Sequence, residues 1–253
     1  MRILMELSKI YNFFIAPKIF RQRKNMRIAI ISAMEKERKL IIPMLSESEE
    51  TIYAGLDAVK GKIGSHEVVV ATCGIGKVNA ALNTYKVINS FHPDLLINTG
   101  VAGGASSRTK IGDLLVADYV AYHDIWCGPG TQPGVADGLD VFMECDPAII
   151  QLAYKIMEGK RLQVGLICSG DRFISEKREI DEIRQLFPEV VAVDMESAAI
   201  AHVCLVEGVK FNIIRVVSDT PGSGENIDQY KNFWKEAPEK TFAFVEAILK
   251  DLD

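Results

Sequence analysis

The sequence predicts an α/β protein in which helices flank a single mixed, mostly parallel sheet. From Met26 to the C-terminus, short apolar runs rich in β-branched residues alternate with longer amphipathic stretches, as in strands that are connected by helices. The 253 residues suffice for one large core, and 48% apolar and 25% charged residues are an ordinary globular balance. No internal repeat or linker interrupts this pattern, so we expect one domain over residues 26–253.

Seven apolar runs are expected to form strands, at residues 28–32, 68–72, 95–98, 114–117, 164–168, 190–193 and 213–217. The amphipathic stretches between them are expected to form helices, at about residues 35–45, 77–90, 148–157, 177–187, 197–206 and 230–249. In open α/β sheets, ligands bind beyond the carboxyl ends of the strands. The residues that follow each strand are therefore the candidates for a functional site.

The first 25 residues differ in composition from the rest, because apolar and aromatic side chains are followed there by a basic cluster. A signal peptide would carry its charge before the apolar run, and this run is too short to span a bilayer. Met26-Arg27-Ile28 reads as a natural start of the domain. We expect residues 1–25 to be an accessory tail.

Composition also argues against several kinds of partner. A net charge of −5 without a basic stripe makes nucleic acid an improbable ligand, and no segment is expected to enter a membrane. Five cysteines without a CxxC pair fit reduced thiols in the cytoplasm. The four histidines have no metal-ligand spacing, so we expect no metal and no cofactor.

Two glycine turns follow predicted strands. Gly74-Ile75-Gly76-Lys77 lacks the third glycine of a dinucleotide fingerprint, the glycines of 100–104 have the wrong spacing, and neither turn is a phosphate-binding P-loop. Such glycines serve tight strand-to-helix turns or let backbone amides approach a ligand closely. Both interpretations remain open at this point.

Three acids follow predicted strands and are candidates for chemistry. Glu37 stands in a charged stretch that is also typical of a solvated first helical turn, and Glu196, with Asp194, is also typical of a helix cap. Asp219 follows a strand expected to be buried on both faces and precedes a Pro-Gly loop, a position shared by catalytic acids and turn formers.

Taken together, six blocks carry a resemblance. In chain order they are MRIAIISAMEKE, CGIGKVNAA, INTGVAGG, SGDRFI, VAVDMESAAIAHVC and IIRVVSDTPG. This set closely resembles the 5'-methylthioadenosine/S-adenosylhomocysteine nucleosidases of the purine nucleoside phosphorylase superfamily. The resemblance covers nearly everything from Met26 onward and implies a nucleoside phosphorylase-like fold, a nucleoside substrate and a homodimer.

The resemblance implies a role for each candidate residue. Asp219 is expected to protonate adenine N7 with the help of Ser218, and Glu37 to activate the attacking water beside Arg215. Glu196 is expected to bind the ribose hydroxyls while Met195 packs on the sugar. The base is expected to contact Phe173 and the backbone of Ile174, and the sugar and 5' region to contact Met34 and Ile75.

Two positions depart from the family pattern. Val101 stands where a small hydroxyl side chain is frequent, so a hydrogen bond near the water is absent or supplied otherwise. The segment 123–142 differs from the usual one, which carries a phenylalanine that closes the neighbouring subunit's 5' pocket. Trp126 is the candidate replacement, and the 5' preference stays open.

Three other functions remain alternatives. A nucleoside phosphorylase shares the fold and ribose site, but the places where it typically carries phosphate-binding arginines read AMEKE and LLINTG here. A hydrolase of a futalosine-type precursor shares the nucleoside core. A non-catalytic nucleoside-binding domain is expected to lack at least one of Glu37, Glu196 and Asp219, whereas all three are present.

Overall fold

A computed structural model describes residues 25–136, 138–236 and 238–252, and within 236–241 it gives only the backbone. The expectation for the tail of residues 1–25 therefore lies outside the described residues, apart from Asn25. All seven predicted strands and the helices between them are present, so the α/β class is confirmed.

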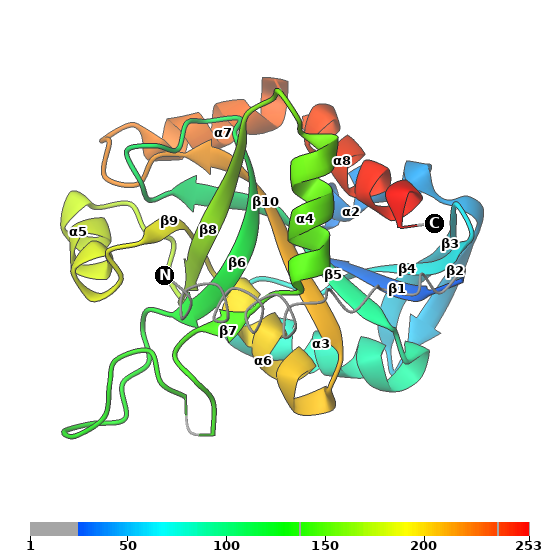
Figure 1. Ribbon diagram of the computed structural model, residues 1–253, viewed down its shortest axis with the longest axis horizontal. Coiled ribbons are helices and arrows are strands. Elements are labelled where there is room, and N and C mark those ends of the chain that lie inside the picture. Colours follow the sequence, from blue (N-terminus) through cyan, green and yellow to red (C-terminus); the bar gives the residue numbers. More distant parts are fainter. Residues whose placement is uncertain (1–24, 137, 237, 253) are drawn as a thin grey trace, which may run out of the picture.

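One ten-stranded mixed sheet forms the centre of the molecule (Figure 1). Five strands pair into a closed ring in the order β5, β10, β6, β8, β9 and back to β5. From β5 the sheet continues outward through β1, β4, β3 and β2, and the short β7 pairs with β6. The bounds are β1 Arg27–Ser32, β2 Ser46–Tyr53, β3 Leu56–Ile63, β4 His66–Thr72, β5 Leu95–Gly104, β6 Leu114–Tyr122, β7 Met143–Glu144, β8 Leu162–Ser169, β9 Val190–Asp194 and β10 Lys210–Asp219.

The direction of pairing explains where the site forms. The pairs β1–β4, β1–β5, β5–β10, β6–β8 and β8–β9 are parallel, whereas the hairpin β2–β3 and the pairs β3–β4, β5–β9, β6–β7 and β6–β10 are antiparallel. The carboxyl ends of the parallel strands β1, β4, β5 and β10 therefore gather on one side of the sheet, and the antiparallel pair β5–β9 brings the last residues of β9 to Gly103 and Gly104 at the end of β5. The acids and glycine turns of the sequence follow these ends.

Helices cover both faces of the sheet (Figure 1). Their bounds are α2 Glu35–Ile41, α3 Lys77–Phe91, α4 Pro147–Ile156, α5 Lys177–Leu186, α6 Ser197–Glu207, α7 Asn226–Glu236 and α8 Pro238–Asp251. Side chains of α3 and α6 pack in one core cluster, and those of α2, α4 and α8 in another. No helix in the described ranges is long and apolar enough to cross a membrane.

Two helix expectations need correction. The helix predicted at 35–45 ends at Ile41 and continues as the short 3₁₀ turn Ile42–Met44, which contains Pro43. The stretch 230–249 is not one helix but two, since α7 starts earlier, at Asn226, and α8 begins at Pro238. A proline lacks the backbone N–H that a continuous helix needs there, so it starts a new helix.

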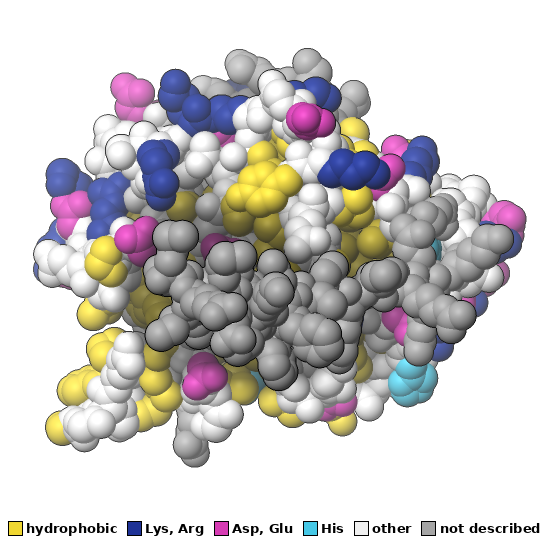
Figure 2. All heavy atoms as spheres, in the orientation of Figure 1, with side chains coloured by type: hydrophobic (Ala, Val, Ile, Leu, Met, Phe, Trp, Pro, Cys, Tyr) yellow, Lys and Arg dark blue, Asp and Glu magenta, His cyan; other side chains and the backbone are white. Residues whose placement is uncertain are grey.

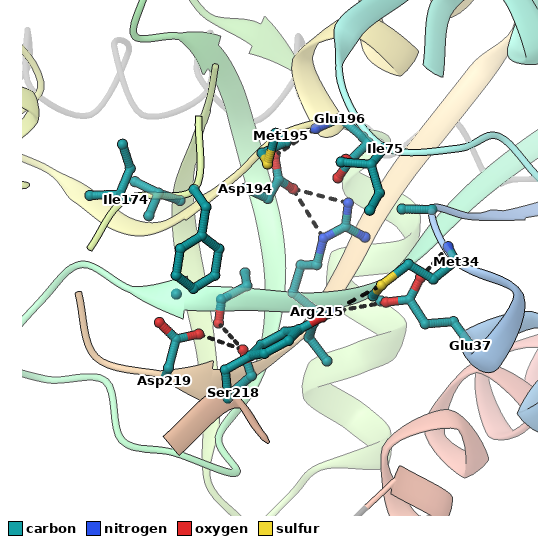
Figure 3. A pocket seen from close by; sticks show the side chains of 18 of the residues that line it. Met34, Glu37, Ile75, Ile174, Asp194, Met195, Glu196, Arg215, Ser218 and Asp219 are labelled. Carbon is teal, nitrogen blue, oxygen red and sulfur yellow. Dashed lines mark hydrogen bonds and ion pairs between the residues drawn. The ribbon is translucent and has the colours of Figure 1, made fainter. Parts of the chain in front are cut away.

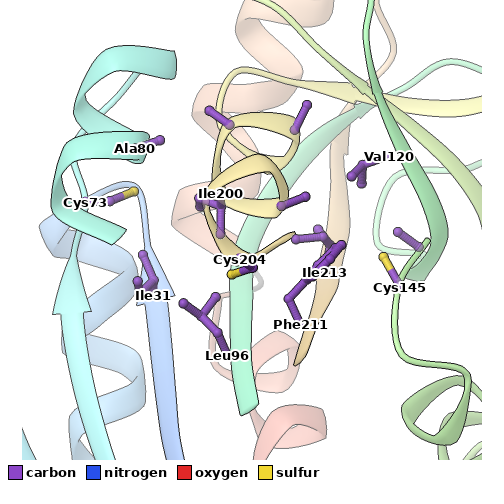
Figure 4. Close-up of a cluster of buried hydrophobic side chains, with 14 of the residues drawn as sticks. Ile31, Cys73, Ala80, Leu96, Val120, Cys145, Ile200, Cys204, Phe211 and Ile213 are labelled. Atoms are coloured by element: carbon purple, nitrogen blue, oxygen red, sulfur yellow. The ribbon is translucent and has the colours of Figure 1, made fainter. Parts of the chain in front are cut away.

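Strand β1 shows how the sequence divides the core. Ile28 and Ile30 point to the cluster under α2 and α8, whereas Ala29 and Ile31 point to the cluster under α3 and α6 (Figure 4). All four are fully or nearly fully buried. A strand that is apolar at every position is thus buried on both faces, which is typical of a parallel sheet covered on both sides by helices.

The visible surface carries charges of both signs. On the face in Figure 2, Lys and Arg side chains lie beside Asp and Glu side chains around the rim. Surface ion pairs of the described residues include Lys155 with Asp251 at 2.9 Å and Lys177 with Asp181. This interspersed pattern agrees with the absence of a basic stripe from the sequence.

Candidate active site

A single pocket at the carboxyl ends of the strands brings all ten predicted site residues together (Figure 3). They come from five separate parts of the chain, which the fold joins at one edge of the sheet. The residues are Met34, Glu37, Ile75, Phe173, Ile174, Met195, Glu196, Arg215, Ser218 and Asp219. The predicted residues thus share one pocket, and their roles in it stay predictions.

Glu37 lies in the first turn of α2 but is 1% exposed, so it is not part of a solvated helical turn. Its Oε2 accepts a hydrogen bond from the backbone N–H of Met34 at 2.9 Å, which satisfies one free donor at the helix start. Its Oε1 accepts from the backbone N–H of Val101 at 3.3 Å. Burial raises the pKa of Glu37, while Arg215 and these amides oppose the rise.

Gly100 on β5 makes room for this carboxylate. A Cβ atom at position 100 would lie 2.6 Å from Glu37 Oε1 and 3.2 Å from Glu37 Cδ. The glycine of the INTG block therefore serves a close approach between a strand and a side chain of the site. For the glycines of 100–104, the structure thus favours the interpretation that a glycine permits a close approach within the pocket.

Arg215 and Asp194 form a buried ion pair behind the pocket wall. The guanidinium Nε and Nη2 each lie 3.0 Å from Asp194 Oδ2, and both side chains are 2% exposed. Nη2 also donates to Asn98 Oδ1 and, at 2.8 Å, to Ser197 Oγ. Asp194 thus largely neutralises the charge of Arg215 inside the protein. Arg215 acts on Glu37 only by a Coulombic interaction, without a hydrogen bond.

Asp194 has a second task, which the sequence analysis raised only as an alternative. Its Oδ1 accepts from the backbone N–H groups of Glu196 and Ser197 at 3.3 and 3.2 Å, so Asp194 caps α6. Ser169 Oγ donates to the same oxygen at 2.6 Å. Glu196, in contrast, makes no side-chain cap, which leaves its carboxylate for the pocket.

The backbone of the glycine turn at residues 74–77 holds the Glu196 carboxylate. Its Oε1 accepts from the backbone N–H of Gly76 at 2.9 Å, where the chain has φ +89°, a conformation that favours glycine. Burial and, second, the nearby Asp194 raise the pKa of Glu196 to about 7, although the Gly76 amide and Arg215 oppose this. The second glycine turn therefore also serves the pocket.

Asp219 closes β10 and is 2% exposed. Ser218 Oγ donates to Asp219 Oδ1 at 2.7 Å, and the side chain of Asn226 forms a further hydrogen bond with it. Burial raises the pKa of Asp219 despite these two bonds, and no cation is among the causes that oppose the rise. A carboxyl group in such surroundings holds its proton at a higher pH than an exposed aspartate does.

The remaining lining is mostly apolar, and one of its residues, Tyr230, was missed. Tyr230 of α7 packs edge-on against Phe173, with ring centroids 5.8 Å apart, and its hydroxyl lies 3.5 Å from Met34 Sδ. It joins two parts of the pocket that are far apart in the sequence. Nothing in the sequence marks this position, because its relevance depends on how α7 packs. The other lining residues outside the predicted set are Ala33, Thr99, Gly100, Val101, Ala102, Gly103, Arg172, Val193, Asp194 and Pro221.

The arrangement separates its charges in a way that suits an acid-base reaction. Glu37 and Glu196 lie near the buried Arg215–Asp194 pair, whereas Asp219 stands apart from it, next to Ser218 (Figure 3). In the described residues, no group of three or more His, Cys, Asp or Glu side chains is placed to hold a metal ion. The described site thus offers carboxyl groups, backbone amides and apolar walls for its chemistry.

Comparisons with known proteins give the class. A family model described as the phosphorylase superfamily matches residues 27–250. A 5'-methylthioadenosine/S-adenosylhomocysteine nucleosidase of Geobacillus thermodenitrificans is 36% identical over 228 residues, which are 88% of this chain and 96% of that protein. The family model covers all six sequence blocks except Met26.

Solved structures give the same result. An S-adenosylhomocysteine nucleosidase of Streptococcus pyogenes in complex with 5-methylthiotubericidin superposes with a TM-score of 0.86 at 32% identity, over 90% of this chain and 98% of that one. A nucleosidase of S. pneumoniae with the transition-state inhibitor MT-ImmA gives 0.86 at 33% identity, over 90% and 100%. The chain belongs to the phosphorylase superfamily and, within it, to the 5'-methylthioadenosine/S-adenosylhomocysteine nucleosidases.

Proposed function

We propose that this protein hydrolyses the N-glycosidic bond of 5'-methylthioadenosine and S-adenosylhomocysteine, and so releases adenine and a 5'-substituted ribose. The observation that carries this proposal is the presence of two separated, buried carboxyl groups, Asp219 and Glu37, in one pocket, where burial raises the pKa of each. The ligands of the related structures, 5-methylthiotubericidin and the transition-state inhibitor MT-ImmA, support the same substrate class.

The purine end of the pocket is formed by Asp219, Phe173 and Ile174. The Asp219 carboxyl group donates its proton to N7, so that adenine leaves as a neutral base. Ser218 and Asn226 fix the orientation of this carboxyl group through their hydrogen bonds. Phe173 is 44% exposed and presents an apolar ring on which a purine can stack.

The sugar end is formed by Glu196 and Met195. Glu196 accepts hydrogen bonds from the ribose hydroxyls while the Gly76 amide holds it in place. When ionised, its negative charge stabilises the positive charge that develops on the sugar as the glycosidic bond breaks. Met195 supplies the apolar contact to the ribose.

The attacking water is activated by Glu37, which accepts its proton as the new bond forms. Val101 provides no hydroxyl at this site, but its backbone N–H holds the Glu37 carboxylate directly. The departure from the family pattern therefore leaves the base fixed. Arg215 lowers the pKa of Glu37 by a Coulombic interaction, without a hydrogen bond.

We predict that the reaction is hydrolysis and does not require phosphate. A phosphorylase needs cations for its anionic nucleophile, but Arg215 is bound to Asp194, and Arg172 forms an ion pair with Glu179 at 2.6 Å. An anion about 4 Å from ionised Glu37 would be repelled by roughly 4 kcal/mol at an effective dielectric constant of about 20. Adenine release from 5'-methylthioadenosine is therefore expected to be complete in phosphate-free buffer.

The measurement is adenine release with and without added phosphate, together with ³¹P NMR of the products. We expect equal rates and a free thioribose in both buffers. A sugar phosphate, or a rate that depends on phosphate, would assign the protein to the phosphorylases instead. Absence of adenine from both reactions would favour a non-catalytic binding domain.

The dimer and the cellular location are also part of this proposal. Val78, Leu82 and Tyr85 lie on one side of α3 and are 76%, 52% and 49% exposed, and Val206 of the adjoining α6 is 67% exposed. An apolar surface of this kind fits contact with a second copy of the chain. A solution mass of a single chain, measured by sedimentation equilibrium, would exclude the dimer.

The cytoplasm is the compartment that suits the free cysteines Cys73, Cys127, Cys145, Cys168 and Cys204.

A further inference from the structure

The cation of Lys36 is held by two aromatic side chains, one of which, Tyr230, lines the pocket. Its Nζ lies 3.8 Å from the ring centroid of Trp234 and 4.8 Å from that of Tyr230, and it donates to the Tyr230 hydroxyl at 3.1 Å. No acid among the described residues forms an ion pair with Lys36. Its exposed neighbour Glu35 pairs with Arg38 instead, at 3.0 Å.

The position of Lys36 relates it to one end of the substrate. Asp219 and Phe173 take the base, Glu196 takes the sugar hydroxyls and Glu37 takes the water. The wall formed by Met34 and Tyr230 is left for the substituent on C5' of the sugar. Lys36 contacts the ring and the hydroxyl of Tyr230 in this wall. A longer 5' substituent that extends out of the pocket past Tyr230 would therefore approach the ammonium group of Lys36.

The two proposed substrates differ at this end. The 5' substituent of 5'-methylthioadenosine is a neutral methylthio group, whereas that of S-adenosylhomocysteine is a thioether chain that ends in an ammonium group and a carboxylate. An ammonium cation that is fixed by aromatic rings and has no acid partner attracts a carboxylate. The base and ribose of the two substrates are the same.

We propose that Lys36 is a specificity-determining residue that binds the carboxylate of S-adenosylhomocysteine and favours this substrate over 5'-methylthioadenosine. The inference rests on the proposed function and adds the recognition of the 5' substituent to it. Tyr230 and Trp234 are positioning residues, since they hold the ammonium group at the rim.

The test is a cycle of changes in the protein and in the substrate. Lys36→Met removes the charge and keeps much of the apolar length, and Lys39→Met makes the same change at another exposed lysine of α2. For each protein, kcat/KM is measured with 5'-methylthioadenosine, S-adenosylhomocysteine and the analogue of the latter that lacks only the carboxylate.

We expect Lys36→Met to lower the ratio of kcat/KM for S-adenosylhomocysteine to that for 5'-methylthioadenosine by about two- to fivefold, the strength of an exposed ion pair. Lys36→Glu is expected to lower it further, and added salt to lower it in the unmodified protein but not in Lys36→Met. Lys39→Met is expected to leave the ratio unchanged, as is Lys36→Met when the analogue replaces S-adenosylhomocysteine.

An unchanged ratio in both Lys36 variants would overturn the inference, as would an equal fall with the analogue. A change in the packing of Tyr230 alone would lower kcat/KM for all three substrates together and leave the ratios as they are, which also counts against it. Failure of the proposed function is recognised separately, because the unmodified protein would then release no adenine from 5'-methylthioadenosine.

Discussion

Replacement of Asp219 by Asn is expected to lower kcat by about 10²- to 10⁴-fold, the usual contribution of general acid catalysis. Asparagine keeps the shape of the side chain and can still bond Ser218 and Asn226, but it has no proton to give to adenine N7. KM is expected to change much less than kcat, because the proton is transferred only as the bond breaks. Steady-state kinetics with adenine release as the signal measures both.

The same substitution is not expected to destabilise the fold. Because burial raises the pKa of Asp219 in the folded protein, the folded state holds this proton more tightly than the unfolded chain does. The stability that it contributes is therefore present below the unfolded pKa and is lost as pH rises through the folded pKa. Asparagine removes this loss, so the melting temperature at alkaline pH should equal or exceed that of the unmodified protein.

Two controls sharpen the test of Asp219. Asp57→Asn makes the same change on an exposed residue of β3 outside the pocket and is expected to leave kcat unchanged. A nucleoside whose leaving group needs no protonation should lose much less activity with Asp219→Asn than an adenine nucleoside does. Near-normal turnover of 5'-methylthioadenosine by Asp219→Asn would remove this residue from the acid role.

Gly100→Ala is expected to cost about 10²-fold in kcat, the typical consequence of moving a catalytic group by about 1 Å. The new methyl carbon would lie 2.6 Å from Glu37 Oε1, and the carboxylate is the part that can move away. It would then give up the amide of Val101 and its position beside the water. The protein should stay folded, as circular dichroism and thermal melting can show.

Gly165→Ala is the matched control for this effect. It introduces an equally close contact inside the sheet, 2.7 Å from Val191 Cγ1, but away from the pocket. If Gly100→Ala acts through Glu37, it should add little to the loss already caused by Glu37→Gln. Full additivity of the two changes, or normal activity of Gly100→Ala, would contradict this explanation.

The sequence predicts the central strands and the pocket because their signals are local. The centre of β1, from Ile28 to Ile31, is apolar at every position, and acids stand shortly after such strands. The hairpin β2–β3 has no comparable signal. The side chains of β2 are mostly polar and exposed, and its turn places Ala54 at φ 49°, an uncommon conformation for alanine. Its stability comes from pairing with β3, which a residue pattern does not contain.

Within the site, the sequence identifies the residues that differ chemically from their surroundings and misses those that matter by placement. Glu196 and Asp219 are acids that follow apolar strands, so they stand out, whereas Glu37 stands in a charged stretch and is singled out by the resemblance of its sequence block. Tyr230 and Asn226 lie in an ordinary amphipathic helix, and only its packing brings them to Phe173 and Asp219. Their contribution is a tertiary property.

The double attachment of Glu37 has a consequence for the energetics of turnover. One oxygen of its carboxylate holds the start of α2 and the other holds the backbone of β5. A free glutamate side chain would lose rotational freedom when it orders a water, a cost of roughly 1 to 2 kcal/mol. Here that conformational entropy is lost when the protein folds. The substrate therefore meets a base that is already immobile, and none of its binding energy is consumed in ordering it.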